Sequence, residues 1–318
     1  GSPPQLAPAF EQLLSQRLSA LYDPLVLWWT DGSAIVEPSC LIAKGLPDPE
    51  TFAALLDGSW SDRQWHSIPA RITAATVSGD TLVDDLMPPR FRSAAASDVG
   101  RVRAVNQDSY LERSDVGVWV VADGLGGHSD GEIASRMVCD ALADLLPGAG
   151  FEQMIEAARE RVTQVNEHLV RAAVRSHNDV GSGSTVVTLL ARGSRCVVLW
   201  AGDSRVYRWR SGHLDRLTRD HSLAESEGDT VRGANPNAVT RAVGGEPTLR
   251  LDERRDRVRP GDRFLLCSDG LTRIVPESRI RAWLEHEDIR QAVDGLIKTT
   301  LEAGAPDNVT ALIVEAYA

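Results

Sequence analysis

The sequence lacks the features that mark disulfide-bonded, zinc-binding and membrane-spanning proteins. Its four cysteines lie far apart and form no CxxC pair, so we expect buried free thiols. No apolar run approaches the roughly 20 residues that a helix needs to span a bilayer. No secretory leader is evident, although Gly1-Ser2 is typical of a cloning scar. The expected location is therefore the reduced cytoplasm. The cysteines are Cys40, Cys139, Cys196 and Cys267.

A basic surface is also missing. The formal net charge is −11 at pH 7, and because binding to a phosphate backbone needs positive charge, nucleic acid is not an expected partner. An acidic chain fits a protein that holds divalent cations, although many solvated proteins are equally acidic. Hydrophobic residues make up 42% and charged residues 25% of the 318 residues. This composition is ordinary for a globular protein with one large domain or two smaller ones.

The first ~92 residues differ from the rest, because they hold four of the eight tryptophans. We predict that residues 1–92 form a small α+β accessory module of unknown role plus a linker, and that residues 93–318 form a second domain. Pro88-Pro89 and Ser93–Ser97 are typical of a linker. The elements predicted in the module are a helix over 10–21, a β-hairpin over 25–36, a helix over 49–56 and strands over 72–77 and 81–86.

Beyond residue 97, apolar runs alternate with helical patterns. Strands come in runs and helices in pairs, without regular βαβ alternation, which favours antiparallel sheets with helices layered outside. The predicted strands are 116–122, 185–191, 196–201, 205–209, 264–268 and 309–315. The predicted helices are 132–146, 151–176 and 289–301.

The segment VWVVADGLGGHSDGEIAS holds an apolar run that ends on Asp123, followed directly by Gly124. A carboxylate at a strand end suits a hard metal ion, and the bare glycine backbone beside it offers a carbonyl oxygen as a second ligand. Asp-Gly is also a common turn dipeptide. The other ligands must therefore come from distant segments.

Four further aspartates share this pattern: Asp108, Asp203, Asp269 and Asp307 lie at predicted strand boundaries beside Gly, Ser or Asn. Any one of them alone is typical of a turn or a strand cap. Five together favour a metal centre, and oxygen ligands select Mg²⁺ or Mn²⁺ over zinc. Two such ions would hold and deprotonate a bridging water and would neutralise charge on a phosphoryl group.

Several segments resemble, in the same order, the motifs of the metal-dependent serine/threonine protein phosphatases of the PP2C (PPM) family, in its bacterial branch. These segments are SDVGRVRAVNQDS, VADGLGGHSDGEIAS, GSGSTVV, AGDSRVYRWR, LTRDHS, VTRAVGG, RFLLCSDGLT and DNVTALIV. The resemblance covers residues 97–318 and not the first ~92. It implies a four-layer αββα sandwich of two mainly antiparallel sheets flanked by helices, an α/β (α+β) class.

The resemblance also implies a binuclear centre of Mn²⁺ or Mg²⁺. Asp123 would bridge the two ions, the Gly124 carbonyl would complete the coordination of one, and Asp269 and Asp307 would bind the other. Asp108 would hold metal-bound waters, so that all four aspartates would be catalytic.

A third ion and the phosphate site are implied as well. Asp203 would form the weaker third metal site together with Asp269, with a hairpin cap as its alternative role. Arg103 stands five residues before Asp108, where the family keeps its phosphate-binding arginine, and this spacing favours it over Arg101. A guanidinium grips two phosphate oxygens in a way that lysine does not reproduce.

Other positions carry less chemistry. His128 matches the bacterial GGH element, and a bond to the loop backbone is favoured over a role as general acid. Gln107 replaces an acidic residue often found before the second aspartate. His221 and Arg241 are expected to position the flap over 223–239, which we expect to be a mobile loop with little helix. Ser204 is adjacent to no histidine base in the sequence, so a turn role is favoured.

The implied activity is dephosphorylation of phosphoserine and phosphothreonine on proteins that a Ser/Thr kinase has modified. A metal-activated water would attack phosphorus in one step, without a covalent phosphoenzyme. The alternative is a catalytically weak signalling adaptor with a phosphatase fold, regulated through its N-terminal module. The module itself is open to two roles, partner binding or self-association.

Overall fold

The computed structural model describes residues 28–30, 33–35, 89–126, 130–145, 150–176, 182–227 and 235–317. The chain divides into two compact units, Gly1–Met87 and Pro88–Ala318. In the first unit, β1 (Trp28–Thr30) pairs antiparallel with β2 (Ser33–Ile35), which confirms the predicted hairpin. The other elements predicted before residue 88 lie outside the described residues. The role of this unit as an accessory module stays a prediction.

The second unit contains two antiparallel sheets. The five-stranded sheet runs in the order β10 (His213–Arg216), β9 (Arg205–Arg210), β12 (Arg263–Cys267), β13 (Val309–Tyr317) and β3 (Arg90–Asp98). The six-stranded sheet includes β11 (Asp252–Arg257), β8 (Arg195–Ala201), β7 (Val186–Arg192), β5 (Val118–Leu125) and β4 (Asp108–Arg113) in this order, and β6 (Gly183–Ser184) pairs with the end of β5.

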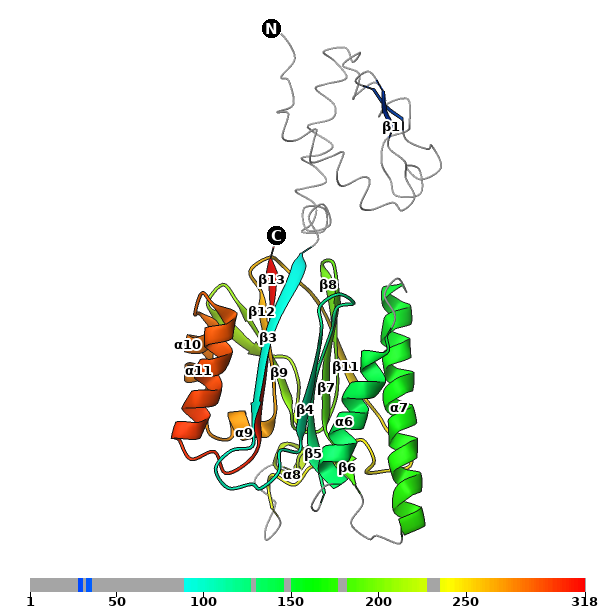
Figure 1. Ribbon diagram of the computed structural model, residues 1–318, viewed down its shortest axis with the longest axis vertical. Helices are drawn as coiled ribbons and strands as arrows, with labels where there is room; N and C mark the ends of the chain where they lie inside the picture. Colours follow the sequence, from blue (N-terminus) through cyan, green and yellow to red (C-terminus); the bar gives the residue numbers. More distant parts are fainter. Residues whose placement is uncertain are drawn as a thin grey trace. The chain divides into compact units, whose positions relative to one another are not determined.

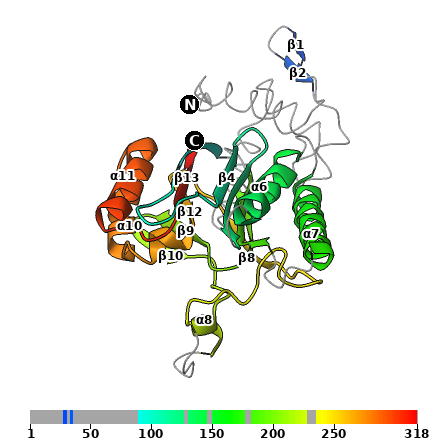
Figure 2. The ribbon, with the colours of Figure 1, turned by 60° about the horizontal axis from the view of Figure 1, so that its bottom comes forward.

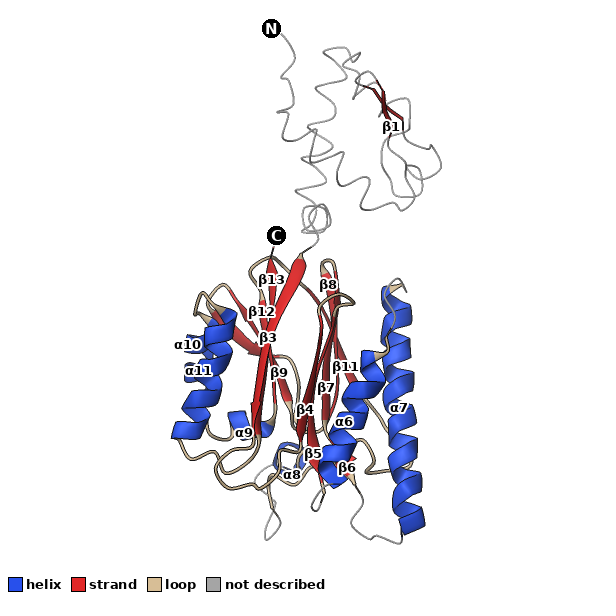
Figure 3. Cartoon of the chain, in the orientation of Figure 1, coloured by secondary structure: helices blue, strands red, loops and turns tan. Residues whose placement is uncertain are grey.

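Helices cover the outer face of each sheet, as Figures 1 and 3 show. The six-stranded sheet is covered by α6 (Asp130–Ala143) and α7 (Phe151–Ser176). The five-stranded sheet is covered by α10 (Glu277–Leu284) and α11 (Ile289–Glu302). Two short helices, α8 (Leu223–Glu227) and α9 (Asp269–Thr272), lie in the connections. The predicted four-layer sandwich is confirmed.

Strand β5 shows why apolar runs suit this architecture. Val118, Val120 and Ala122 pack with the α6–α7 layer. Trp119 and Val121 face the space between the two sheets. Because helices or a second sheet cover both faces, a central strand buries every side chain and reads as a continuous apolar run. The rigid strands end together and fix the loops that follow them.

The interpretation of Ser93–Ser97 as a linker is wrong. This segment lies inside β3, which pairs with β13 from Arg90 to Asp98. Ala94 packs in the core that contains α11, and Ala95 packs between the sheets. Alanine side chains are short, so α11 can lie close to β3. This run of small side chains is therefore a buried strand and not a linker.

Other expectations from composition agree with the structure. Cys139, Cys196 and Cys267 are buried and unpaired, and Cys40 lies outside the described residues. None of the helices in the described ranges is long and apolar enough to cross a membrane.

Candidate metal centre

The five predicted aspartates lie close together, since Asp108, Asp203, Asp269 and Asp307 all act electrostatically on Asp123. Helix α9, which Asp269 opens, and β6 lie at the end of the sandwich drawn at the bottom of Figure 1, which Figure 2 brings forward. Asp108 opens β4 and stands opposite Asp123 in the pairing of β4 with β5. Asp203 lies in the connection between β8 and β9, Asp269 opens α9 directly after β12, and Asp307 lies just before β13. Antiparallel pairing thus gathers residues that are far apart in the sequence.

The backbone at Asp123 is held on both sides. Its N–H donates to Thr185 Oγ1 over 3.0 Å, and its carbonyl accepts from the Thr185 N–H over 2.8 Å. The Gly124 N–H donates to the Gln107 carbonyl over 3.1 Å. A Cβ atom at Gly124 would collide with the carbonyl oxygens of Gly131 and Gln107. Glycine is therefore required here by close backbone approach, and the Asp123 side chain extends from a rigid support.

Asp108 links the two sheets. Its Oδ2 accepts hydrogen bonds from Ser268 Oγ and Thr310 Oγ1, each over 2.7 Å, and both donors belong to the five-stranded side. Its Oδ1 is buried and has no hydrogen-bond partner among the described residues. Burial raises the pKa of Asp108 to about 6, although the two hydroxyls oppose this shift. A buried carboxylate oxygen without a partner fits a group that receives a bond from a water on a bound ion.

Negative charge is crowded at this end of the sandwich. Burial raises the pKa of Asp123 well above its usual range, and the four other aspartates raise it further. Burial, followed by the charge of Asp203, raises the pKa of Asp269 to about 8. Burial also raises the pKa of Asp203. Arg103 and Arg273 offset only part of this negative charge, and divalent cations would offset the rest.

Two arginines contact these carboxylates. Arg103 forms a two-pronged contact with Asp307, Nε to Oδ1 and Nη2 to Oδ2, each over 2.9 Å. Arg273 pairs with Asp269 and with Asp203. As the side chains stand, no three His, Cys, Asp or Glu residues in the described ranges form a ready ligand set. The donors nevertheless fit a hard cation, because they are all oxygens, they repel one another, and Asp108 Oδ1 is unsatisfied.

The structure places the two candidate phosphate-binding arginines differently. The Arg103 side chain reaches the aspartate cluster through Asp307. Arg101 is exposed and donates its backbone N–H to the Ala305 carbonyl over 2.9 Å. His128 lies outside the described residues.

His221 joins the Asp203 loop to the base of the flap. Its Nδ1 accepts the Gly202 N–H over 3.0 Å, and its Nε2 lies 3.2 Å from Asp252 Oδ2 and 2.9 Å from Arg241 Nη1. The His221 carbonyl accepts the Thr240 N–H over 2.8 Å. Burial lowers the His221 pKa, although Asp252 opposes the shift. These contacts agree with the positioning role that the sequence suggested.

Asn308 is a site residue that sequence reasoning missed. Its Oδ1 accepts the Gln107 N–H over 2.9 Å, and its Nδ2 donates to the carbonyls of Val99 and Val105 over 2.9 and 3.0 Å. It therefore holds both ends of the loop that carries Arg103. The only signal was an asparagine directly before an apolar strand, where a turn role would also fit.

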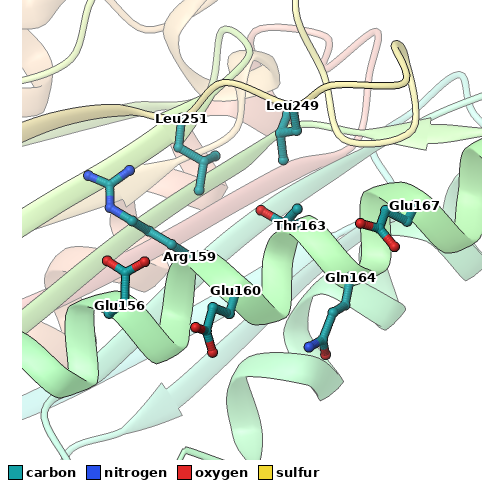
Figure 4. A pocket seen from close by; sticks show the side chains of 8 residues that line it. All are labelled: Glu156, Arg159, Glu160, Thr163, Gln164, Glu167, Leu249 and Leu251. Carbon is teal, nitrogen blue, oxygen red and sulfur yellow. The ribbon is translucent and has the colours of Figure 1, made fainter.

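Two further features carry no part of this centre. Ser204 is buried, and its hydroxyl lies 2.8 Å from Thr185 Oγ1, which agrees with a turn role. A pocket of about 410 Å³ lies between α7 and the segment before β11, and none of the five aspartates lines it. Figure 4 shows the lining residues, Glu156, Arg159, Glu160, Thr163, Gln164, Glu167, Leu249 and Leu251.

Comparison with known proteins finds a family and relatives that match the second unit. A family model described as protein phosphatase 2C matches residues 100–311. Serine/threonine protein phosphatase PstP of Mycobacterium tuberculosis is 35% identical over 240 residues, which cover 71% of this chain and 45% of that protein. The chain thus spans about half the length of that relative. Serine/threonine phosphatase stp of Listeria monocytogenes is 32% identical over 238 residues, 69% of this chain and 93% of that protein.

Solved structures are similar as well. PppA, described as a key regulatory component of T6SS in Pseudomonas aeruginosa, is 43% identical with a TM-score of 0.69, covering 72% of this chain and 99% of that one. The catalytic domain of PstP, described as in complex with two manganese ions, is 34% identical with a TM-score of 0.64 at the same coverage.

Proposed function

Because this chain belongs to the protein phosphatase 2C family, we propose that it removes phosphate from phosphoserine and phosphothreonine side chains of proteins. The observation that carries the proposal is the arrangement of five aspartates at one end of the sandwich. A candidate phosphate-binding arginine, Arg103, contacts one of them, Asp307.

We propose that Asp123 bridges two Mn²⁺ or Mg²⁺ ions, that the Gly124 carbonyl serves one, and that Asp269 and Asp307 serve the other. Bound ions supply activation of the attacking water and neutralise charge on the phosphoryl group. The raised pKa values of Asp123 and Asp269 support this assignment, because crowded, desolvated carboxylates are stabilised by a cation. The two manganese ions described for the PstP catalytic domain support it too.

The chain's own residues would bind and orient the substrate and the water. Arg103 offers a planar fork for two phosphate oxygens. Asp108, fixed by Ser268 and Thr310, accepts a hydrogen bond from the attacking water and holds it in place. No protein nucleophile is needed. Burial raises the pKa of the nearby Cys267 thiol to about 12, so that it stays protonated and inert.

We further propose a cytoplasmic phosphoprotein, modified by a Ser/Thr kinase, as the substrate. The buried free thiols support a reducing compartment. For the N-terminal part of the chain, which the sequence bounds at residue 92 and the structure at Met87, we propose an accessory role, either binding of a partner or self-association. The rest of the chain is the proposed phosphatase domain.

The test is hydrolysis of a phosphothreonine peptide and of p-nitrophenyl phosphate by the full chain, with and without Mn²⁺. We expect hydrolysis to require the metal, and Asp123→Ala to lower kcat/KM by about 1000-fold, because loss of a bridging ligand removes several kcal/mol of charge stabilisation. Asp294→Asn, an exposed change on α11, is the matched control. Equal rates for the wild type and Asp123→Ala with Mn²⁺ present would favour the signalling-adaptor alternative.

A further inference from the structure

Arg273 occupies the position between the two carboxylates that the resemblance assigns to a third ion. It caps the C-terminal end of α9, and its Nη2 atom contacts the Oδ2 atom of Asp269 and also, over 3.4 Å, the Oδ2 atom of Asp203. A single nitrogen thus contacts one oxygen from each aspartate. Both oxygens would otherwise be available to a cation.

The local fold explains why the arginine lies there. Arg273 follows Asp269 by four residues, and its N–H donates to the Asp269 carbonyl over 2.9 Å, which closes one helical turn. Residues four apart lie on the same face of a helix, so the guanidinium lies beside the Asp269 carboxylate. Asp203 lies in the β8–β9 connection, two residues after the end of β8, and is buried.

The exposed fractions of the three side chains show that Arg273 covers the two carboxylates. The side chains of Asp203 and Asp269 are 7% and 11% exposed, whereas that of Arg273 is 39% exposed. Two nearly buried carboxylates need a positive partner, and an arginine is charged at every pH that the protein meets. Arg273 supplies that charge from the solvent side, independently of any metal in solution.

We infer that Arg273 takes the place of the third divalent cation, so that this chain works with two ions. The inference rests on the proposed binuclear centre. The guanidinium engages an oxygen of each carboxylate, and its positive charge repels a further cation at the same place. Asp203 then forms an ion pair with the Arg273 guanidinium and does not bind a metal ion.

The test counts Mn²⁺ ions bound to the full chain by elemental analysis after equilibrium dialysis, with isothermal titration calorimetry for affinity. Arg273→Gln removes the charge, and Arg273→Lys keeps it. Arg281→Gln is the matched control, because Arg281 forms an (i, i+4) pair with Glu285 over 3.1 Å on α10. Thermal unfolding shows that each variant is folded.

We expect two ions per chain in the wild type, Arg273→Lys and Arg281→Gln. We expect a third ion in Arg273→Gln, bound at least about tenfold more tightly than any third ion in the wild type, because a repulsive charge is gone. Three ions in the wild type would overturn the inference without any variant, as would an unchanged count and affinity in Arg273→Gln. A wild type that binds no Mn²⁺ would instead contradict the proposed function.

Discussion

The carboxylate of Asp269 should destabilise the metal-free protein at neutral pH. Its pKa is raised from 3.8 to about 8, first by burial and then by Asp203, and Arg273 opposes this shift only in part. Between these two values the folded chain holds a proton that the unfolded chain releases. The free energy of unfolding therefore falls as pH rises from about 4 to about 8, and it is unaffected by this group below that window.

The magnitude follows from the width of the window. One pH unit corresponds to about 1.4 kcal/mol, so the penalty reaches about 4 kcal/mol at pH 7 as an upper limit, because Asp203 and Asp123 share the protons. Asparagine carries no charge at any pH. Asp269→Asn should therefore stabilise the metal-free protein by a few kcal/mol at pH 7, and by only about 1 to 2 kcal/mol at pH 5.

The assay is urea unfolding in the presence of a chelator from pH 5 to pH 8, with Asp294→Asn on the exposed face of α11 as the control. The control should follow the wild type at each pH. Mn²⁺ should then stabilise the wild type and have little effect on Asp269→Asn, because the variant lacks a proposed ligand. A variant no more stable than the wild type at pH 7.5, or a difference that does not grow with pH, would refute this reasoning.

Two further predictions concern the phosphate site and the boundary between the units. Arg103→Lys should lower kcat/KM for a phosphopeptide by roughly 10- to 100-fold, mainly by raising KM, because an ammonium group cannot bind two phosphate oxygens in one plane. An unchanged KM would argue against phosphate binding by Arg103. A chain that starts at residue 88 should keep its phosphatase activity, whereas one that starts at residue 93 should lose about 1 to 3 kcal/mol of stability. The reason is that the shorter chain loses Phe91, whose ring lies edge-on to that of Trp119 with the ring centroids 5.4 Å apart. Equal urea midpoints for the two chains would contradict this.

The elements that the sequence predicted are those with a periodic or continuous apolar pattern. Helix α7 ends at Ser176 as expected, and its apolar face runs from Phe151 to Leu169. The predicted apolar strands appear as β7, β8, β12 and β13. Strand β11, DERRDR, was not predicted, because it is an edge strand that pairs with β8 on one side only and its side chains are mostly exposed. Backbone pairing with β8 determines the structure of β11, and its sequence has no apolar alternation that would predict a strand.

The residues of the candidate site also differ in whether the sequence alone predicts them. Asp123 and Asp269 carry local signals, since each follows an apolar run in the sequence and precedes a glycine. The contacts of Asn308 and Arg273 depend on loops and strands that only the folded sheets bring together. A sequence pattern therefore indicates which carboxylates belong to the centre, but not which side chains hold or neutralise them.

The most direct test of the metal centre is anomalous scattering at the manganese edge from crystals of the full chain grown with Mn²⁺. We expect two strong peaks beside the Asp123 carboxylate, one of them also beside Asp269 and Asp307, and no peak between Asp203 and Asp269. Absence of any peak at Asp123 in protein that hydrolyses phosphopeptides would contradict the account.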